Sequence, residues 1–143
     1  MPAVFVPDVL SLIVCDQIII DRLTGKMSLI GLFSNIGAFQ FPVRHPQLCV
    51  FATLTEGRGQ TPIEIGIIDA NDERPPVVQG TAGVEFKDPH ALATLNLHFN
   101  GLVFPEPGQY RVQLRCHGEL LREARLHLAK VKPPERQKND EEE

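Results

Sequence analysis

The feature that most constrains this chain is a series of short runs in which apolar and polar residues alternate. The clearest run is residues 110–117 (YRVQLRCH), in which every second residue is apolar. A period of two places successive side chains on opposite faces of a β-strand, so that one face can be buried. The chain also has 12 prolines and 11 glycines, which are typical of turns between strands. The pattern therefore predicts an all-β fold.

About eight strands are expected. They are residues 10–20, 27–33, 47–56, 63–67, 78–86, 95–100, 110–117 and 120–131. Residues 34–46 contain two prolines and are expected to form an irregular connection. Residues 121–125 have helix propensity, but they follow a tight hairpin at residues 117–119. They are therefore expected to be strand, with a bulge.

The strands are expected to pack as two sheets. Sequential hairpins favour antiparallel pairing, and turns at regular spacing fit a sandwich or a barrel. One alternating core strand per hairpin favours two packed sheets over a barrel with a lumen. The predicted fold class is a mainly antiparallel two-sheet β-sandwich of about eight strands. Much of its core is expected to come from Tyr110, Val112, Leu114, Leu126, Leu128, Ile65, Ile67, Leu97 and Phe99.

The 143 residues are expected to form one domain and a tail. Residues 1–131 are the predicted β-sandwich domain. Residues 132–143 (KPPERQKNDEEE) have no apolar residue able to anchor them. They are therefore expected to be a disordered charged tail.

Two segments resemble known families. The ending FPEPGQYRVQLRCHGELLREARLHL resembles the last hairpin of immunoglobulin-like and C2-like sandwiches, with a Pro-Gly corner before a Tyr-led strand. The opening VCDQIIIDRLTGKMSLIGLFSNI resembles the start of a bacterial family of small proteins of unknown function. The features shared with that family are a Cys-Asp pair, a Thr-Gly-Lys turn and a Leu-Ile-Gly strand. The resemblance covers nearly the whole chain except the tail, and it implies a β-sandwich module with no assigned chemistry.

Charge and hydropathy exclude several partners. The net charge is −4, so the molecule as a whole does not attract nucleic acid. No run of about 20 apolar residues is present, so no membrane helix is expected. The N-terminal segment has no basic region, and Asp8 and Asp16 interrupt it, which argues against a signal peptide. The odd cysteine count, with Cys15, Cys49 and Cys116, then indicates reduced thiols in the cytoplasm.

Two short motifs suggest chemistry at first sight. Gly25-Lys26 lacks the earlier glycine and the following helix of a phosphate-binding loop, so a hairpin turn is expected. Cys15-Asp16 lacks a basic neighbour that would activate the thiol, so Cys15 is expected to be a core or sheet residue. The Asp16 carboxylate is expected to find backbone donors or an arginine partner, either Arg22 or Arg44.

Metal sites are not expected, and no cofactor is predicted. Zinc needs four ligands that converge, and the sequence offers only the pairs His45 and Cys49, four residues apart, and Cys116 and His117, which are adjacent. Cys116 and His117 would face opposite sides of a strand, so both cannot easily bind one ion. Asp69, Asn71 and Asp72 are similar in type to calcium-binding loops, but no second acidic loop accompanies them. A solvated loop is expected there.

The outward face of the last hairpin is the candidate site. We name it the basic stripe, and it consists of Arg111, Arg115, His117, Arg125 and His127. Antiparallel pairing would bring these side chains together on an acidic protein. One reading is a solvated strand face that balances the acidic tail. The other is a surface for an acidic protein partner, with the tail as a competitor.

The predicted function is a non-catalytic binding or scaffolding module that acts through protein–protein contacts. Its exposed strand edges also allow self-association or pairing with an extended peptide. Two other classes stay open. One is a cryptic hydrolase that uses a Cys/His or Asp/His pocket, and the other is a structural subunit of a larger assembly.

Overall fold

The computed structural model of the protein describes residues 5–134, which contain nine β-strands and no helix. The strands are β1 (Asp8–Ile20), β2 (Met27–Leu32), β3 (Asn35–Ala38), β4 (Val43–Thr55), β5 (Gly59–Asp69), β6 (Val78–Phe86), β7 (Ala93–Phe104), β8 (Gly108–Cys116) and β9 (Glu119–Lys130). The all-β prediction is confirmed. No helix in this range is long and apolar enough to cross a membrane. The predicted disordered tail, from residue 135 onward, lies outside the described residues.

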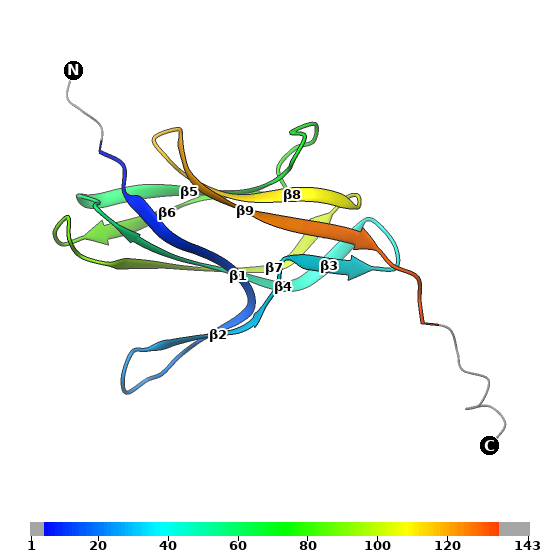
Figure 1. The fold of residues 1–143 in the computed structure, drawn as a ribbon, viewed down its shortest axis with the longest axis horizontal. Coiled ribbons are helices and arrows are strands. Elements are labelled where there is room, and N and C mark those ends of the chain that lie inside the picture. Colours follow the sequence, from blue (N-terminus) through cyan, green and yellow to red (C-terminus); the bar gives the residue numbers. More distant parts are fainter. Residues whose placement is uncertain (1–4, 135–143) are drawn as a thin grey trace.

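The strands form two sheets that lie over one another (Figure 1). One sheet has four strands in the order β2-β1-β4-β7, and the other has five in the order β3-β9-β8-β5-β6. Neighbours are antiparallel except for β3, which runs parallel to β9. The predicted arrangement of two mainly antiparallel sheets therefore holds, but the five-stranded sheet is mixed.

The prediction that residues 34–46 form an irregular connection is wrong. Strand β3 lies within this segment, and β4 begins within it at Val43. The backbone N–H of His127 donates to the carbonyl of Ser34 at 2.8 Å, and that of Val131 donates to Ala38 at 2.9 Å. Ile36 and Ala38 are buried. A strand of four residues is too short to show alternation, and its partner β9 is distant in the sequence. Its existence is therefore decided by tertiary pairing.

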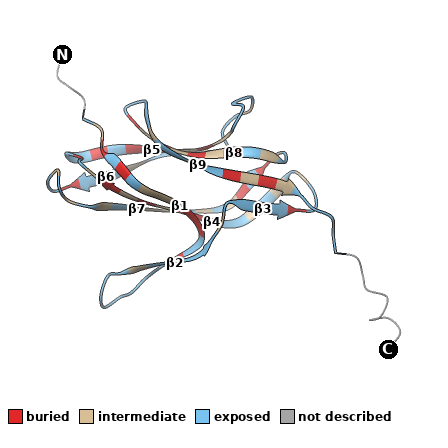
Figure 2. Ribbon diagram, viewed as in Figure 1, coloured by how far each residue is buried: buried red, intermediate tan, exposed pale blue. Residues whose placement is uncertain are grey.

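The core lies between the two sheets. Buried residues alternate with more exposed ones along β5 and β8, and Figure 2 shows buried and exposed positions alternating along the ribbons. The largest fully buried side chains include Phe104, Leu48, Leu54, Ile63, Ile67, Leu114, Leu126 and Leu128. Seven of the nine predicted core residues are buried, and the other two, Leu97 and Phe99, are half-buried against the core.

Leu97 and Phe99 are less covered because they lie on β7, which is an edge strand. Gly101 of β7 has a φ of 68°, a conformation that glycine adopts without steric cost. Before it, the odd-numbered Leu95 is buried, and after it the even-numbered Leu102 and Phe104 are buried. Gly101 therefore marks the point where the strand changes the side that faces the core.

The predicted bulge in the last strand is present. Leu114 pairs with Arg122 and Arg115 pairs with Leu120, so Leu121 is an extra residue on β9. A bulge of this kind leaves one residue unpaired and increases the local twist. The helix propensity of residues 121–125 is overridden by pairing with β8.

The β1–β2 hairpin extends away from the two-sheet body (Figure 1). Its apolar side chains Ile18, Met27 and Leu29 pack against Cys15, Cys49 and Phe51 in a second buried cluster. The amide of Asn96, on β7, donates to the Met27 sulfur at 3.2 Å. In a flat sheet β1 and β4 would separate these two residues. The hairpin must therefore curl over the outer face of the four-stranded sheet.

Truncating Leu114 tests the face assignment. Leu114→Ala should lower the free energy of unfolding by about 2–5 kcal/mol, because it removes a fully buried side chain. Urea unfolding followed by circular dichroism measures this loss. Leu23→Ala is the control, since Leu23 is 97% exposed and its truncation should change stability little. Equal effects of the two substitutions would show that the assigned face is wrong.

Candidate functional site

The basic stripe lies on the face of β8 and β9 that points away from the core. The residues that alternate with its arginines, Val112 and Leu114, are fully buried, so Arg111 and Arg115 must point outward. Arg111 and Arg125 are directly opposite each other in the β8–β9 pair. His127 is opposite Gln109, and its Nδ1 lies 2.9 Å from the Gln109 side-chain nitrogen. The antiparallel pairing thus brings four of the five predicted residues onto one face.

His117 is the exception. It lies in the tight turn between β8 and β9, is exposed, and has a φ of 50°. Gly118 follows it with a φ of 81°. The predicted turn is therefore confirmed, and His117 lies at the end of the stripe, beyond the strand.

One carboxylate lies within the stripe. Glu123 accepts a hydrogen bond from Gln113 at 2.9 Å and lies 3.8 Å from the Arg111 Nε. Arg115 in turn donates to the Gln113 side-chain oxygen at 3.3 Å and to the carbonyl of Gly118 at 3.3 Å. These contacts connect residues of both strands and hold Arg111 and Arg115 in place.

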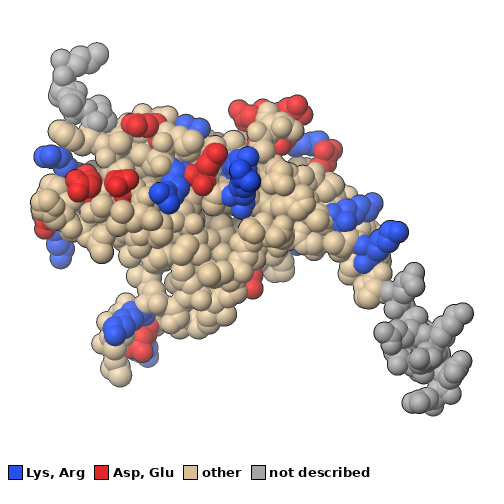
Figure 3. Space-filling model, viewed as in Figure 1, with Lys and Arg blue, Asp and Glu red and all other residues tan. Residues whose placement is uncertain are grey.

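The stripe has more positive than negative groups, although it is not purely basic. Glu64 of β5 is the neighbour of Arg115 in the next strand. The space-filling view likewise shows basic and acidic side chains mixed over β5 and β9 (Figure 3). Among the described residues, the Nη1 of Arg111 is buried and has no hydrogen-bond partner. Arg111, which faces a second arginine, is thus only partly satisfied by its contact with Glu123.

A shallow hollow of about 230 Å³ adjoins the stripe. It lies above Gly66 of β5, which pairs with Gln79 of β6 on one side and Gln113 of β8 on the other. Because glycine has no side chain, a gap opens between the two glutamines. Arg115 and Glu64 also line it. The alternating pattern of residues 63–67 did not predict this hollow, although Gly66 within the strand was a signal for it.

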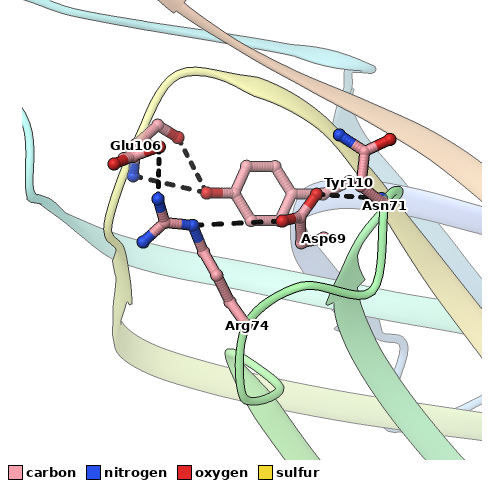
Figure 4. A network of polar contacts seen from close by, with 5 residues as sticks. All are labelled: Asp69, Asn71, Arg74, Glu106 and Tyr110. Atoms are coloured by element: carbon pink, nitrogen blue, oxygen red, sulfur yellow. Dashed lines mark hydrogen bonds and ion pairs between the residues drawn. The ribbon is translucent and has the colours of Figure 1, made fainter.

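A polar network lies where β5 leads into the loop before β6 (Figure 4). The Tyr110 hydroxyl donates to the backbone carbonyl of Glu106 at 2.7 Å. Arg74 forms an ion pair with the Glu106 carboxylate and lies 3.9 Å from Asp69. The Asp69 carboxylate also accepts a hydrogen bond from the backbone of Asn71 at 3.0 Å. The network ties the loop of residues 70–77 to the corner that precedes β8.

Two of the three candidate calcium residues, Asp69 and Asn71, are part of this network. The side chain of Asp69 contacts Arg74 and accepts a hydrogen bond from the backbone of Asn71, so its oxygens stabilise the loop. In residues 5–134, no group of three or more His, Cys, Asp or Glu side chains could hold a metal ion. His45 with Cys49, and Cys116 with His117, are not brought into such a group.

The two remaining motifs have structural roles. Gly25 has a φ of 71° in a turn that the Asp21 carboxylate stabilises by accepting hydrogen bonds from Leu23 and Thr24. These bonds lower the pKa of Asp21. Gly25-Lys26 is thus the predicted hairpin turn.

Asp16 differs from the prediction. It is exposed, and none of the ion pairs among the described residues joins it to Arg22 or Arg44. Its carboxylate lies against Gly31 of β2, where a Cβ atom would be 2.4 Å from the carboxylate oxygen. An exposed carboxylate keeps its hydration, so no partner is required.

The structure also brings together a cysteine and a histidine that the sequence analysis could not pair. The Cys49 sulfur lies 3.2 Å from the His98 Nδ1. The two residues are directly opposite in the β4–β7 pair. They are 49 positions apart in the sequence, so no local motif could have revealed this contact.

The ionisation of Tyr110 offers a test of the network. Burial raises the pKa of Tyr110, against the lowering effect of its bond to Glu106. Tyr110 is the one tyrosine of the chain and tryptophan is absent, so ultraviolet absorbance follows it directly. The folded protein should therefore titrate at higher pH than the denatured chain, which should titrate near pH 10. Stability from this group is present below that pH and is lost as the pH rises through the folded pKa.

Tyr110→Phe should abolish the absorbance change, and it should cost about 0.5–1.5 kcal/mol of stability through the lost hydrogen bond. If the tyrosine titrated at the same pH in the folded and denatured protein, the hydroxyl would not be in the network described.

The comparisons with known proteins add one match. A family model described as "Family of unknown function (DUF6941)" matches residues 10–129, which is most of the chain. No curated protein matches the sequence.

Proposed function

We propose that this chain, which belongs to the family of unknown function (DUF6941), is a non-catalytic immunoglobulin-like module that binds an acidic protein surface. The single observation that carries the proposal is the direct opposition of Arg111 and Arg125 on an outward sheet face. The fold type and the binding surface are supported by separate observations.

The strand order supports the immunoglobulin-like assignment over the C2-like one. Immunoglobulin domains place strands A, B and E in one sheet and strands C, F and G in the other. Here β1, β4 and β7 are neighbours in one sheet, and β5, β8 and β9 are neighbours in the other. Tyr110 also corresponds to the tyrosine corner of such domains, whose hydroxyl bonds to the backbone a few residues upstream.

The paired arginines support the choice of partner. Like charges that face each other directly across a strand pair are destabilising. Among the ion pairs of the described residues, only the one with Glu123, at 3.8 Å, offsets the repulsion at Arg111. Carboxylates of a partner would relieve the repulsion and accept the arginine donors. An acidic protein surface is therefore the partner we propose, with a cytoplasmic location because all three cysteines are free thiols.

A structural subunit is the second candidate, and the β1–β2 hairpin favours it. Ile30 and Leu32 of β2 are exposed, and β2 is an edge strand with one side unpaired within the sheet. Such an edge can pair with another copy of the chain. Light scattering distinguishes the two candidates, because a subunit forms a discrete oligomer whereas the module remains monomeric.

The hydrolase alternative has less support. It requires a Cys or an Asp that meets a His in an accessible pocket. Cys49 meets His98, but the Cys49 side chain is fully buried, which leaves no space beside its sulfur for a substrate as large as an ester or a peptide.

Charge reversal tests the proposed function. Arg111→Glu with Arg125→Glu should weaken capture of the partner from cell lysate by at least about tenfold, because it replaces both attractive charges with repulsive ones. Arg22→Glu with Lys26→Glu is the matched control, since it makes the same change in net charge at exposed positions of the hairpin tip. The control should retain capture.

Both variants should unfold at wild-type temperatures, and capture by the wild type should fall at high salt. A bait without residues 132–143 should capture at least as much partner, because the acidic tail competes. Capture that is equal for the two double variants, with both folded, would overturn the proposal.

A further inference from the structure

Three side chains form a row across the outer face of the four-stranded sheet. Cys15 of β1 is directly opposite Cys49 of β4, and Cys49 is directly opposite His98 of β7. Their strand neighbours Val14 and Val50 belong to the core between the sheets, so the row points the other way. It lies on the sheet that does not carry the basic stripe and does not rest on the proposed function.

The two thiols are placed for a bond. Directly opposite residues of antiparallel strands have Cα atoms about 4.5–5.5 Å apart, which is within the span of a disulfide, about 4.4–6.8 Å. Their side chains point to the same face. Cys15 and Cys49 are free thiols in one buried cluster. A disulfide between them therefore requires no change in the pairing of β1 with β4.

His98 distinguishes the two thiols. Its Nδ1 lies 3.2 Å from the Cys49 sulfur, where it can take the thiol proton. His98 is exposed, so the Cys49 thiol is one side chain away from solvent. Burial, and then the neighbouring Cys49, raise the pKa of the Cys15 thiol, which keeps Cys15 protonated. Cys49 is thus the attacking thiol and Cys15 the resolving one.

We propose that Cys15, Cys49 and His98 form an oxidation site at which a peroxide converts the two thiols to a cross-strand disulfide. The Cys49 proton moves to His98 Nδ1, and the thiolate attacks one oxygen of hydrogen peroxide. The O–O bond breaks, the leaving hydroxide takes the proton from His98, and the products are water and a Cys49 sulfenic acid. The Cys15 sulfur then attacks the Cys49 sulfur, the S–O bond breaks, and the second water carries away the Cys15 proton.

The disulfide would also loosen the β1–β2 hairpin. The Cys15 thiol lies 3.5 Å from the carbonyl oxygen of Gln17, to which it donates. The Cys49 sulfur lies 3.5 Å from the carbonyl oxygen of Asp16, which is the more distant of the two acceptors for its one proton, after His98 Nδ1. These carbonyls lie where β1 leaves the body and enters the hairpin. A disulfide has no S–H group, so the Gln17 carbonyl loses its thiol donor and the Asp16 carbonyl loses the donor that Cys49 can offer it. Oxidation should therefore raise the exposure of the hairpin backbone to solvent.

The experiment treats the full chain with hydrogen peroxide at neutral pH, and mass spectrometry then maps a non-reduced tryptic digest. Tryptic cleavage places the three cysteines in separate peptides, residues 1–22, 45–58 and 116–122. The expected result is loss of two thiols per chain and a cross-link between the first two peptides. A cross-link that includes Cys116, or oxidation of all three thiols at one rate, would overturn the proposal.

Variants assign the roles. Cys116→Ala is the matched control, because Cys116 is as buried as the pair but lies in the other sheet. It should leave the rate of disulfide formation unchanged. His98→Phe should slow the loss of thiols by at least about tenfold, because the base is removed. An unchanged rate in folded His98→Phe would contradict the role of His98.

Cys15→Ala should stop the reaction at a sulfenic acid on Cys49, which a dimedone probe labels. If this variant does not fold, the wild-type peptide map still decides where the bond forms. Hydrogen exchange of residues 17–32 should be at least about tenfold faster in the oxidised protein. Exchange equal to that of the reduced protein would contradict the release of the hairpin.

Discussion

Burial of alternate side chains between the two sheets is the interaction on which the rest of the structure depends. Leu48 and Leu54 of β4 point toward Ile67, Leu114 and Leu126 of the other sheet, and all five are fully buried. Burial of each such side chain contributes about 1.5–3 kcal/mol to the free energy of unfolding. The contributions of all the buried side chains together are large compared with the net free energy of unfolding of a domain, about 5–15 kcal/mol. The strands therefore have little freedom to turn their other faces to the core.

The same constraint decides what reaches the surface. A slip of β9 by one residue against β8 would turn the buried side chains of β9 outward and its outward Arg125 toward the core. With the core fixed, Arg111 and Arg125 must both face solvent and each other. On the other sheet, the register of β1 and β4 fixes Cys15 opposite Cys49. Both proposed sites are therefore consequences of strand register, and neither depends on a flexible loop.

The sequence predicted those features whose cause is local. Alternation in residues 110–117 predicted β8 and its buried face, and the tight turn at His117 predicted the strand that follows. Strand β3 was missed, because a four-residue strand is defined by a parallel partner far along the chain. The β1–β2 hairpin was predicted, but its curl over the outer face of the sheet was not, because that curl depends on a contact with β7, which is distant in the sequence. The contact between Cys49 and His98 depends on the pairing of β4 with β7, which no single strand reveals.

The basic stripe shows the limit of a pattern more clearly. The sequence placed the arginines on the right face, yet it did not show that Glu123 lies beside Arg111. It predicted backbone donors or an arginine, Arg22 or Arg44, as the partner of Asp16, whereas Asp16 is exposed and lies against Gly31. Periodicity determines the face of a side chain, while its charged neighbours are set by the register of adjacent strands.

The central claim is the register of these two strand pairs, and nuclear Overhauser effects measured by NMR test it most directly. The account predicts cross-strand contacts that place Arg111 opposite Arg125 and Cys15 opposite Cys49. Contacts that place Arg111 opposite Ala124 or Leu126 would contradict the account. In that register Arg125 would no longer lie opposite Arg111, and the buried side chains of β9 would point to solvent.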